Sequence, residues 1–259
     1  MNEKMTVQWF PGHMAKTRRL IKESLALVDA VCEIVDARIP ESSRNPELDE
    51  IVGSKPRIVL LNKCDLADDR ATAKKIKELA AKGVTALPVD CRSGKGLEKF
   101  QPAVREILKD KIKANAEKGM AGKYRAKVAD KPGVTRGNQW FAIGSGIELL
   151  DTPGVLWPKF EDPEVGFKLA FIGSVKDEIL DSQEIAVRLL RVMQVNYPDR
   201  LTERYKISDF EELEPYELLE LIGAKRGMLI KGGETDTERA AVMLLDEYRS
   251  GKLGKLTLD

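Results

Sequence analysis

RIVLLNKCDL, residues 57–66, is an apolar run of strand length that ends in a polar Asn-Lys-Cys-Asp turn. Continuous apolar runs of this kind are typical of parallel strands that are covered on both faces. A second apolar run ends in a comparable way at LLDTPG, residues 149–154. Because open α/β sheets bind ligands beyond the carboxyl ends of their strands, both turns are candidates for one binding edge.

Strand and helix patterns alternate around this stretch. AVCEIVDA (30–37) and VTALPVD (84–90) read as further short strands, whereas ATAKKIKELAAKG (71–83) and residues 96–115 read as amphipathic helices. The alternation predicts an α/β fold with a mostly parallel sheet and helices on both faces. Residues 138–154 read as a hairpin of two strands.

The pattern changes to helices alone from about Ser182. The amphipathic stretches are SQEIAVRLLRVMQV (182–195), EPYELLELIGAKRG (214–227) and DTERAAVMLLDEYRSG (236–251). A chain of 259 residues is long enough for two domains with separate cores. We therefore expect an α/β domain over residues 1–178 and an all-helical domain over residues 179–259.

Composition excludes several other classes of protein. One-third of the residues are charged and the net charge is +1, which is typical of a soluble globular protein. The three cysteines form no CxxC pair and the chain has one histidine, which argues against a zinc site and favours a reducing compartment. No apolar run approaches the ~20 residues of a membrane span. We expect a cytoplasmic protein without a membrane partner.

The Asn-Lys-Cys-Asp turn carries side chains that suit guanine. The Asp65 carboxylate can accept hydrogen bonds from the ring N–H and the exocyclic amine of guanine, a pattern that adenine does not offer. The Asn62 amide can meet another edge of the base, and the stem of Lys63 can lie over its plane. The alternative is an ordinary polar turn in which Asp65 caps the next helix.

A glycine-containing loop follows the next strand at VDCRSGKGL, residues 89–97. The backbone N–H groups of Asp90 and Cys91 could bind the oxygen of the same base, and a plain glycine turn is the alternative. The predicted base-binding residues are therefore Asn62, Lys63, Cys64, Asp65, Asp90 and Cys91.

Two other segments suit phosphate and Mg²⁺. Asp151 of the DTPG turn can hold Mg²⁺ through water, and Gly154 can donate its N–H to a terminal phosphate. KPGVTRG, residues 131–137, supplies Thr135, whose hydroxyl could be a second protein ligand of Mg²⁺. For DTPG the alternative is a simple proline–glycine turn.

With these motifs the chain resembles the YlqF/RbgA-type circularly permuted GTPases, which are ribosome-assembly factors. The resemblance covers nearly the whole length. It includes VQWFPGHMAK (7–16), DARIPESSRNP (36–46), PGVTRGNQW (132–140), LLDTPGVLWPKFEDPEVGFKLA (149–170) and the helical tail. It implies a circularly permuted P-loop GTPase domain, in which guanine-reading motifs precede phosphate-reading ones, because the chain order changes while the site is retained.

The resemblance also implies a function. It points to a GTP-binding and GTP-hydrolysing assembly factor for the large ribosomal subunit, a monomer off the ribosome, with GTP or GDP, Mg²⁺ and K⁺ as cofactors. Val155 stands after DTPG, where many GTPases place a glutamine that orients water. The resemblance points instead to His13 as the water-positioning residue, although chemistry alone leaves a structural role open.

The phosphate loop implied by the resemblance is missing from the sequence. Such a loop needs a buried strand, G-x-x-x-x-G-K-[ST] and a helix. Residues 109–130 contain no apolar run suited to that strand, and Gly122-Lys123 is followed by Tyr124, which cannot supply the Mg²⁺ hydroxyl. About 25 residues are absent, judged from the size of such strand–loop–helix units.

Two explanations of this gap are open: a true deletion, or a unit that is present in the molecule and absent from the 259-residue sequence. A sheet without its central strand would have bare edges, which are costly, so we expect the second. If the unit is truly deleted, the alternative function is a non-hydrolysing ribosome- or RNA-binding protein.

Three segments have a composition that suits RNA. QWFPGHMAKTRR (8–19) joins aromatic and basic residues, residues 105–131 are rich in Lys and Arg, and GAKRGMLIKGG (223–233) lies in the helical tail. Core packing of the aromatics and a solvated basic face are the alternatives. We expect ribosomal RNA to contact the helical domain.

Overall fold

The structure is a computed structural model, and it describes Arg19 and residues 21–117, 124–129, 139–144, 146–152, 162–175 and 181–259. For residues 124–129, Gln139 and Thr152 it describes the backbone alone. The chain divides into two compact units, Met1–Glu161 with Asp259, and Asp162–Leu258. The predicted boundary at residue 178 falls outside the described residues and stays a prediction.

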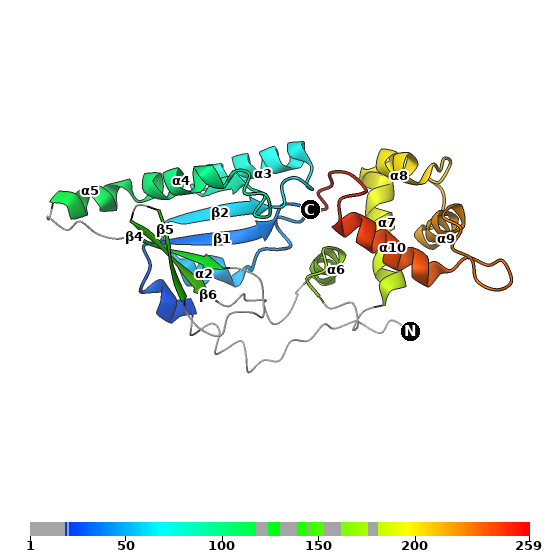
Figure 1. Ribbon diagram of the computed structural model, residues 1–259, viewed down its shortest axis with the longest axis horizontal. Helices are drawn as coiled ribbons and strands as arrows, with labels where there is room; N and C mark the ends of the chain where they lie inside the picture. Colours follow the sequence, from blue (N-terminus) through cyan, green and yellow to red (C-terminus); the bar gives the residue numbers. More distant parts are fainter. Residues whose placement is uncertain are drawn as a thin grey trace. The chain divides into compact units, whose positions relative to one another are not determined.

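The first unit is built on a six-stranded sheet in the order β3-β2-β1-β4-β6-β5 (Figure 1). Its strands are β1 (Ala30–Asp36), β2 (Arg57–Asn62), β3 (Thr85–Pro88), β4 (Tyr124–Ala129), β5 (Gln139–Ile143) and β6 (Ile147–Thr152). Its helices are α2 (Glu47–Val52), α3 (Asp69–Ala81), η1 (Leu97–Lys99), α4 (Phe100–Ile107) and α5 (Lys109–Glu117). All neighbouring strands are parallel except the β5–β6 pair, which confirms the predicted hairpin.

The apolar run that opens the sequence analysis is buried because both of its faces are covered. Ile58 and Leu60 of β2 pack in one cluster with α4, and Val59 and Leu61 pack on the opposite face in a cluster with Leu79 of α3. Alternate residues of a strand point to opposite faces, so an uninterrupted apolar run requires cover on both. The predicted mostly parallel α/β fold is confirmed.

The expectation of a missing central strand is wrong. β4 lies between β1 and β6 and is parallel to both, with Ala126 opposite Ala30 on one side and Leu149 on the other. Its sequence, YRAKVA, alternates rather than forming a continuous apolar run, so the hydrophobic pattern does not mark it as a buried strand. Because β1 and β6 have no bare edges here, the physical argument for an omitted strand no longer holds.

The second unit is helical, as predicted. Its helices are α6 (Pro163–Phe171), α7 (Ser182–Asn196), α8 (Pro198–Tyr205), α9 (Pro215–Lys225) and α10 (Thr237–Arg249). The core holds fully buried side chains from α7, α9 and α10, among them Leu189, Met193, Ile222 and Leu244. Asp181 caps α7 and Asp236 caps α10 through their carboxylates, which stabilises both N-termini. Among the described residues, no helix combines the length and apolar character needed to cross a membrane.

Candidate functional site

Polar residues gather where the parallel strands end. Asp36 ends β1 and lies opposite Asn62, which ends β2. Asp151, near the end of β6, is paired in register with Val128 of β4. Because the carboxyl ends of parallel strands share one edge of the sheet, these side chains stand at the ligand-binding edge predicted from the sequence.

Asn62 joins two loops of that edge. Its Oδ1 atom accepts hydrogen bonds from the backbone N–H of Lys63 at 2.8 Å and of Cys91 at 3.0 Å. A backbone bond from Cys64 N to Val89 O, at 3.1 Å, reinforces the link. The amide oxygen of Asn62 is therefore engaged within the protein, so a base contact from this side chain falls to its amide nitrogen.

Asp65 is exposed at the end of the turn, and no hydrogen bond or ion pair joins it to another residue of the described part of the chain. The cap of α3 is Asp68, whose Oδ1 atom accepts from the N–H of Ala71 at 2.8 Å. The alternative reading of Asp65 as the helix cap is therefore wrong. Its carboxylate is presented to solvent, as a base-reading group requires.

Lys63 has a left-handed backbone, with φ of 59°, which is unusual for a residue with a side chain. Its Nζ atom lies 2.9 Å from Oδ2 of Asp36. Asp36 also binds Arg38, and both side chains are buried. Burial alone would raise the pKa of Asp36, but the hydrogen bonds and charges of Arg38 and Lys63 outweigh it and hold the pKa below its ordinary value.

The loop after β3 is closed by its own hydrogen bonds. The Asp90 carboxylate accepts from the Ser93 hydroxyl and from the backbone N–H of Arg92, and these bonds lower the pKa of Asp90. The backbone N–H of Asp90 donates to Lys95 O at 2.9 Å. A Cβ at Gly96 would lie 2.4 Å from Pro88 O, so this turn requires glycine.

The backbone donors predicted to meet the base oxygen thus already have acceptors inside the protein. Asp90 N donates to Lys95, and Cys91 N donates to Asn62. A base oxygen would have to share or replace these bonds. The contact of Asp90 and Cys91 with a nucleotide stays a prediction.

The predicted phosphate and metal residues are only partly described. Asp151 is half-buried on β6 and has interactions within the protein. His13, Thr135 and Gly154 lie outside the described residues. The described part of the chain holds no group of three or more His, Cys, Asp and Glu side chains suited to a metal ion. A carboxylate and a hydroxyl are still the hard oxygen donors that Mg²⁺ uses alongside water and phosphate, so Asp151 and Thr135 fit that ion by chemistry.

The topology shows where a phosphate loop would have to lie. β4 ends at Ala129 at the binding edge, and the chain continues directly into residues 130–138, which include the KPGVT stretch. Gly122 and Lys123 precede β4 in the chain and lie outside the described residues.

Sequence reasoning assigned no role to Asp36 and Arg38. The two residues lie in the DARIPESSRNP stretch that contributed to the resemblance, but the pattern alone does not reveal that their side chains pair with each other and with Lys63. An Asp at the carboxyl end of a buried strand was the available signal, because ligand edges collect such residues.

Comparison with known proteins identifies the family. A family model described as 50S ribosome-binding GTPase matches residues 115–220. The protein named ribosome biogenesis GTPase A from Priestia megaterium is 44% identical, with 98% of this chain and 97% of that protein covered. The chain belongs to the ribosome biogenesis GTPase A family.

More distant relatives and solved structures agree. Mouse mitochondrial ribosome-associated GTPase 1 is 30% identical, over 97% of this chain and 90% of the relative. A GDP-bound structure of TM YlqF has a TM-score of 0.66 at 26% identity, covering 92% of this chain and 97% of that chain. A GNP-bound structure of YlqF from T. maritima has a TM-score of 0.63 at 27% identity, covering 94% of this chain and 97% of that chain.

The family alignment also bears on the missing phosphate loop. The alignment with the Priestia megaterium protein has 280 positions, whereas the whole chain has 259 residues, so at least 21 positions have no residue here. The shortfall is comparable with the unit of about 25 residues that was expected to be absent, but the strand of that unit is present as β4, so the missing positions correspond to its loop and helix.

Proposed function

We propose that this chain is a guanine-nucleotide-binding assembly factor of the large ribosomal subunit that hydrolyses GTP in the cytoplasm and is a monomer off the ribosome. The observation that carries the proposal is the bond from Cys91 N to Oδ1 of Asn62, which ties the Asn-Lys-Cys-Asp turn to the loop after β3. It brings both predicted base-reading segments to one edge, with the Asp65 carboxylate exposed. The relatives' names, ribosome biogenesis GTPase A, supply the biological setting.

The order of the strands supports a circularly permuted domain. The base-reading turns follow β2 and β3, whereas the predicted Mg²⁺ residue Asp151 lies on β6, later in the chain. In the sheet, β4 nevertheless adjoins β1 and β6 adjoins β4, so the two halves of the site share an edge. Chain order and spatial order therefore differ, as permutation requires.

The chemistry divides between two groups of residues. Asp65 would select guanine, and Asn62 and Lys63 would shape the base pocket. Asp151 through water and Thr135 would hold Mg²⁺, which would neutralise phosphate charge when bound. Gly154 would donate its N–H to the terminal phosphate, and His13 would position the attacking water; K⁺ is a further candidate ion.

A second function is favoured by one observation: the residues that follow the central strand in the chain, 130–138, do not contain the sequence G-x-x-x-x-G-K-[ST] of a phosphate loop. P-loop GTPases hold the β- and γ-phosphates through that loop and its lysine. Without it the chain would recognise the guanosine moiety and bind the ribosome without hydrolysing GTP.

Two measurements test the proposal and separate the alternatives. Titration with fluorescent GDP, competed by unlabelled GTP or ATP, should show displacement by GTP and none by ATP. Phosphate release from GTP in the presence of large ribosomal subunits then distinguishes hydrolysis from binding alone. If ATP displaces the probe as well as GTP does, the site is not specific for guanine. If the chain binds guanine nucleotides but releases no phosphate, the second function holds.

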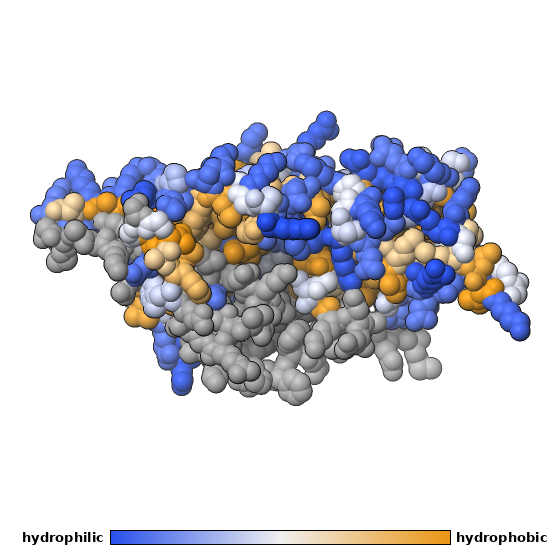
Figure 2. Space-filling view, in the orientation of Figure 1, coloured by the Kyte–Doolittle hydropathy of each residue, from blue (hydrophilic) through white to orange (hydrophobic). Residues whose placement is uncertain are grey.

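The helical unit offers an RNA-facing surface after α9. Residues 224–227 and 229–234 are exposed and include the cations Lys225, Arg226 and Lys231 beside the apolar Leu229 and Ile230. In Figure 2 an apolar patch with a hydrophilic tip lies where Figure 1 draws the loop between α9 and α10. The loop is held in shape by bonds from Ile230 N to Glu234 O and from Asp236 N to Met228 O.

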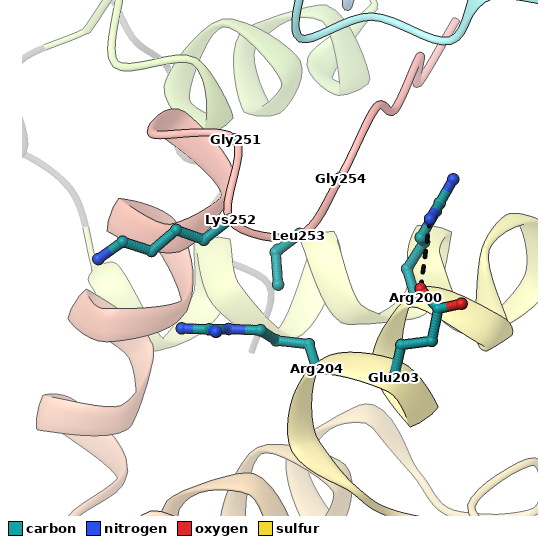
Figure 3. Close-up of a pocket in the computed structure, with 7 residues that line it drawn as sticks. All are labelled: Arg200, Glu203, Arg204, Gly251, Lys252, Leu253 and Gly254. Carbon is teal, nitrogen blue, oxygen red and sulfur yellow. Dashed lines mark hydrogen bonds and ion pairs between the residues drawn. The ribbon is translucent and has the colours of Figure 1, made fainter.

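A second cationic feature of this unit is a cavity of about 290 Å³ between α8 and the turn after α10 (Figure 3). It is lined by Arg200, Glu203, Arg204, Gly251, Lys252, Leu253 and Gly254. Arg200 pairs with Glu203, and Arg204 pairs with Glu247. These arginines are therefore partly neutralised, and so is Arg226, which also lies near Glu247. Lys225 and Lys231 are exposed, and no ion pair joins them to another described residue, so the loop after α9 is the better candidate for RNA phosphates.

Removing charge from this loop tests the RNA contact. A double variant with Lys225 and Lys231 changed to alanine should lose co-sedimentation with large ribosomal subunits and keep its guanine affinity. Arg226 is left in place because it contacts Glu247. The matched control removes two exposed cations of the first unit, Lys77 and Lys82. An equal loss in both variants would mean that overall charge, rather than this surface, determines binding.

A further inference from the structure

The carboxylate of Asp36 gathers four donors at the base-binding edge. Oδ1 accepts from the backbone N–H of Arg38 at 3.0 Å and from its Nε at 2.9 Å. Oδ2 accepts from Nη2 of Arg38 at 2.8 Å and lies 2.9 Å from Nζ of Lys63. One carboxylate therefore holds the guanidinium in a bidentate pair and the lysine ammonium at the same time.

The Asp36–Arg38 pair at the centre of this group is buried. The side chain of Arg38 is 1% exposed and that of Asp36 is 7% exposed. A buried ion pair of this kind persists only when its donors and acceptors are matched, and removal of one partner leaves a charge unpaired. The cluster is therefore fixed in position relative to β1, which it follows directly.

Lys63 is held at both of its ends. Its backbone adopts the left-handed conformation, with its N–H donating to Oδ1 of Asn62 at 2.8 Å. Its carbonyl accepts from Leu66 N at 2.9 Å, and its ammonium is held by Asp36. The side chain is 34% exposed, so part of it is accessible to a ligand while its backbone and its ammonium are both held.

We propose that Asp36, locked by Arg38, is a positioning residue that holds the alkyl stem of Lys63 as a preformed platform for the guanine base. The inference rests on the proposed guanine site, and it adds the residues that order the Lys63 side chain within that site. A stem fixed before binding loses little conformational freedom when the base packs on it, which strengthens binding. Without Asp36, Lys63 would have to be ordered by the nucleotide.

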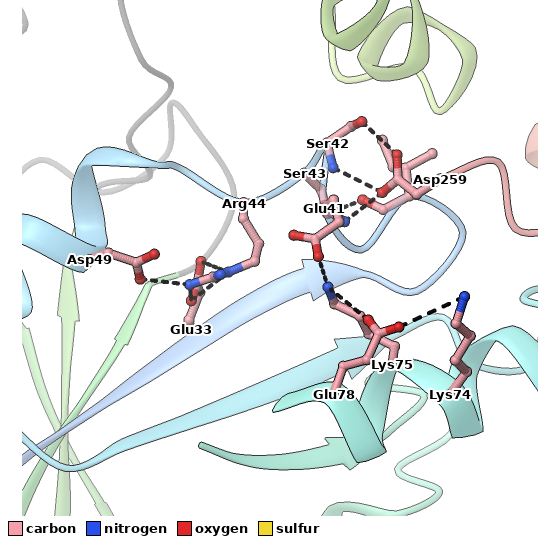
Figure 4. Close-up of polar contacts among 11 residues, drawn as sticks. Glu33, Glu41, Ser42, Ser43, Arg44, Asp49, Lys74, Lys75, Glu78 and Asp259 are labelled. Atoms are coloured by element: carbon pink, nitrogen blue, oxygen red, sulfur yellow. Dashed lines mark hydrogen bonds and ion pairs between the residues drawn. The ribbon is translucent and has the colours of Figure 1, made fainter. Parts of the chain in front are cut away.

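The chain contains a matched control on the same strand. Glu33 of β1 is 4% exposed and is held by a bidentate hydrogen-bonded pair with Arg44, which also pairs with Asp49 (Figure 4). Glu33→Gln therefore removes a buried carboxylate charge from the same element without touching Lys63. Asp36→Asn removes a buried carboxylate charge that does bind Lys63.

The first experiment needs no nucleotide. Acetylation of lysine amines in the folded full chain is followed by mass spectrometry, with Lys55, whose Nζ donates to Val28 O at 2.7 Å, as the internal reference. Asp36→Asn should accelerate labelling of Lys63 at least about threefold relative to Lys55, because its amine loses an ion-pair partner. Glu33→Gln should leave that ratio unchanged. Equal ratios in both variants overturn the claim that Asp36 holds Lys63.

The second experiment measures affinity for fluorescent GDP. Asp36→Asn should raise the Kd about tenfold more than Glu33→Gln does, as expected for one ordered side chain that the ligand must fix. In a Lys63→Met background the same substitution should have little further effect, since the two residues act together. Equal losses in both carboxylate variants, or full additivity with Lys63→Met, overturn the positioning role. If the wild-type chain binds no guanine nucleotide, the proposed function and the platform fail together, whereas the labelling result stands by itself.

Discussion

Asn62 shows how one side chain can organise a site. Its Oδ1 atom accepts from two backbone N–H groups that lie 28 positions apart in the chain, at Lys63 and Cys91. An aspartate would offer the same acceptors, but it would add a charge and lose the amide N–H that remains for a ligand. The asparagine is thus suited both to join the loops and to meet a base.

Asp65 should determine which base is bound. We predict that Asp65→Asn weakens guanine binding and shifts preference toward xanthine, because an amide presents a donor where the carboxylate presents acceptors. Competition of fluorescent GDP binding by GTP and XTP measures the shift, which should be about tenfold or more for one exchanged hydrogen-bond pair.

The control for this variant is Asp68→Asn. It removes the same charge three residues later, and asparagine still caps α3 well, so stability and base preference should both be retained. If Asp65→Asn keeps its preference for GTP, the Asn-Lys-Cys-Asp stretch is a turn without a role in base recognition.

Glu247 of α10 should make the stability of the second unit depend on pH. Its carboxylate accepts from Arg204 Nε and from the Tyr205 hydroxyl, each at 2.9 Å. Burial alone would raise its pKa, but these bonds and the charges of Arg204 and Arg226 hold the pKa below its ordinary value. Because the folded pKa lies below the unfolded one, the stabilisation is complete above about pH 5 and is lost as the pH falls through the folded pKa.

Glu247→Gln should therefore lower the free energy of unfolding at pH 7 by about 1–3 kcal/mol and flatten its dependence on pH below about pH 5. Urea denaturation followed at several pH values measures both effects. Glu238→Gln, an exposed position on the same helix, is the control and should change neither. A pH profile of Glu247→Gln that parallels the wild type would contradict the assignment.

At the scale of elements, β4 is the strand that the sequence did not reveal. A central strand with neighbours on both sides is normally marked by a continuous apolar run, and YRAKVA lacks one. Its place is decided by pairing: it is aligned with β6 over six residue pairs and with β1 over three. Backbone hydrogen bonds to two partners satisfy its polar groups even though its sequence pattern is weak.

This central position gives a prediction about proline. Ala126→Pro removes a backbone donor between β1 and β6 and should destabilise the first unit by about 3 kcal/mol or more. Ala142→Pro on β5 is the matched change on a strand that pairs with β6 alone, and it should cost less. Thermal unfolding of both variants shows which substitution causes the larger loss of stability. An equal or smaller loss for Ala126→Pro would mean that β4 is not a central strand.

At the scale of the whole molecule, the two units have separate cores, so damage to one should leave the other folded. Gly223 of α9 is the position to use, because a Cβ there would lie 2.5 Å from Thr235 Cγ2 and 3.1 Å from Ala240 Cβ. Gly223→Val should force α9 from α10 and destabilise the second unit by about 1–3 kcal/mol. Calorimetry of the full chain should show one transition lowered and a second unchanged.

Ala224→Val is the control for that experiment. The neighbouring residue is exposed on the same helix, so the substitution should cost only the helix propensity of valine, below about 0.7 kcal/mol. If Gly223→Val lowers every transition together, the units unfold as one cooperative body.

The sequence by itself determined the fold class and the helical second unit, and it predicted the base-reading turns. These features are local: hydrophobic periodicity reports burial, and a short polar turn after an apolar strand reports a ligand edge. The runs at residues 57–62 and 182–195 are long and regular enough to specify β2 and α7 without knowledge of their neighbours. The absence of a phosphate loop is likewise a property of the sequence alone.

The tertiary structure decided which residues act together. The pairing of β4 with β1 and β6, the engagement of Asn62 with Cys91 and the bonds from Arg38 and Lys63 to Asp36 join positions whose sequence patterns show no relation. The physical reason is that a strand or a buried charge is stabilised by its partners in space. The chain brings those partners together only when the sheet forms.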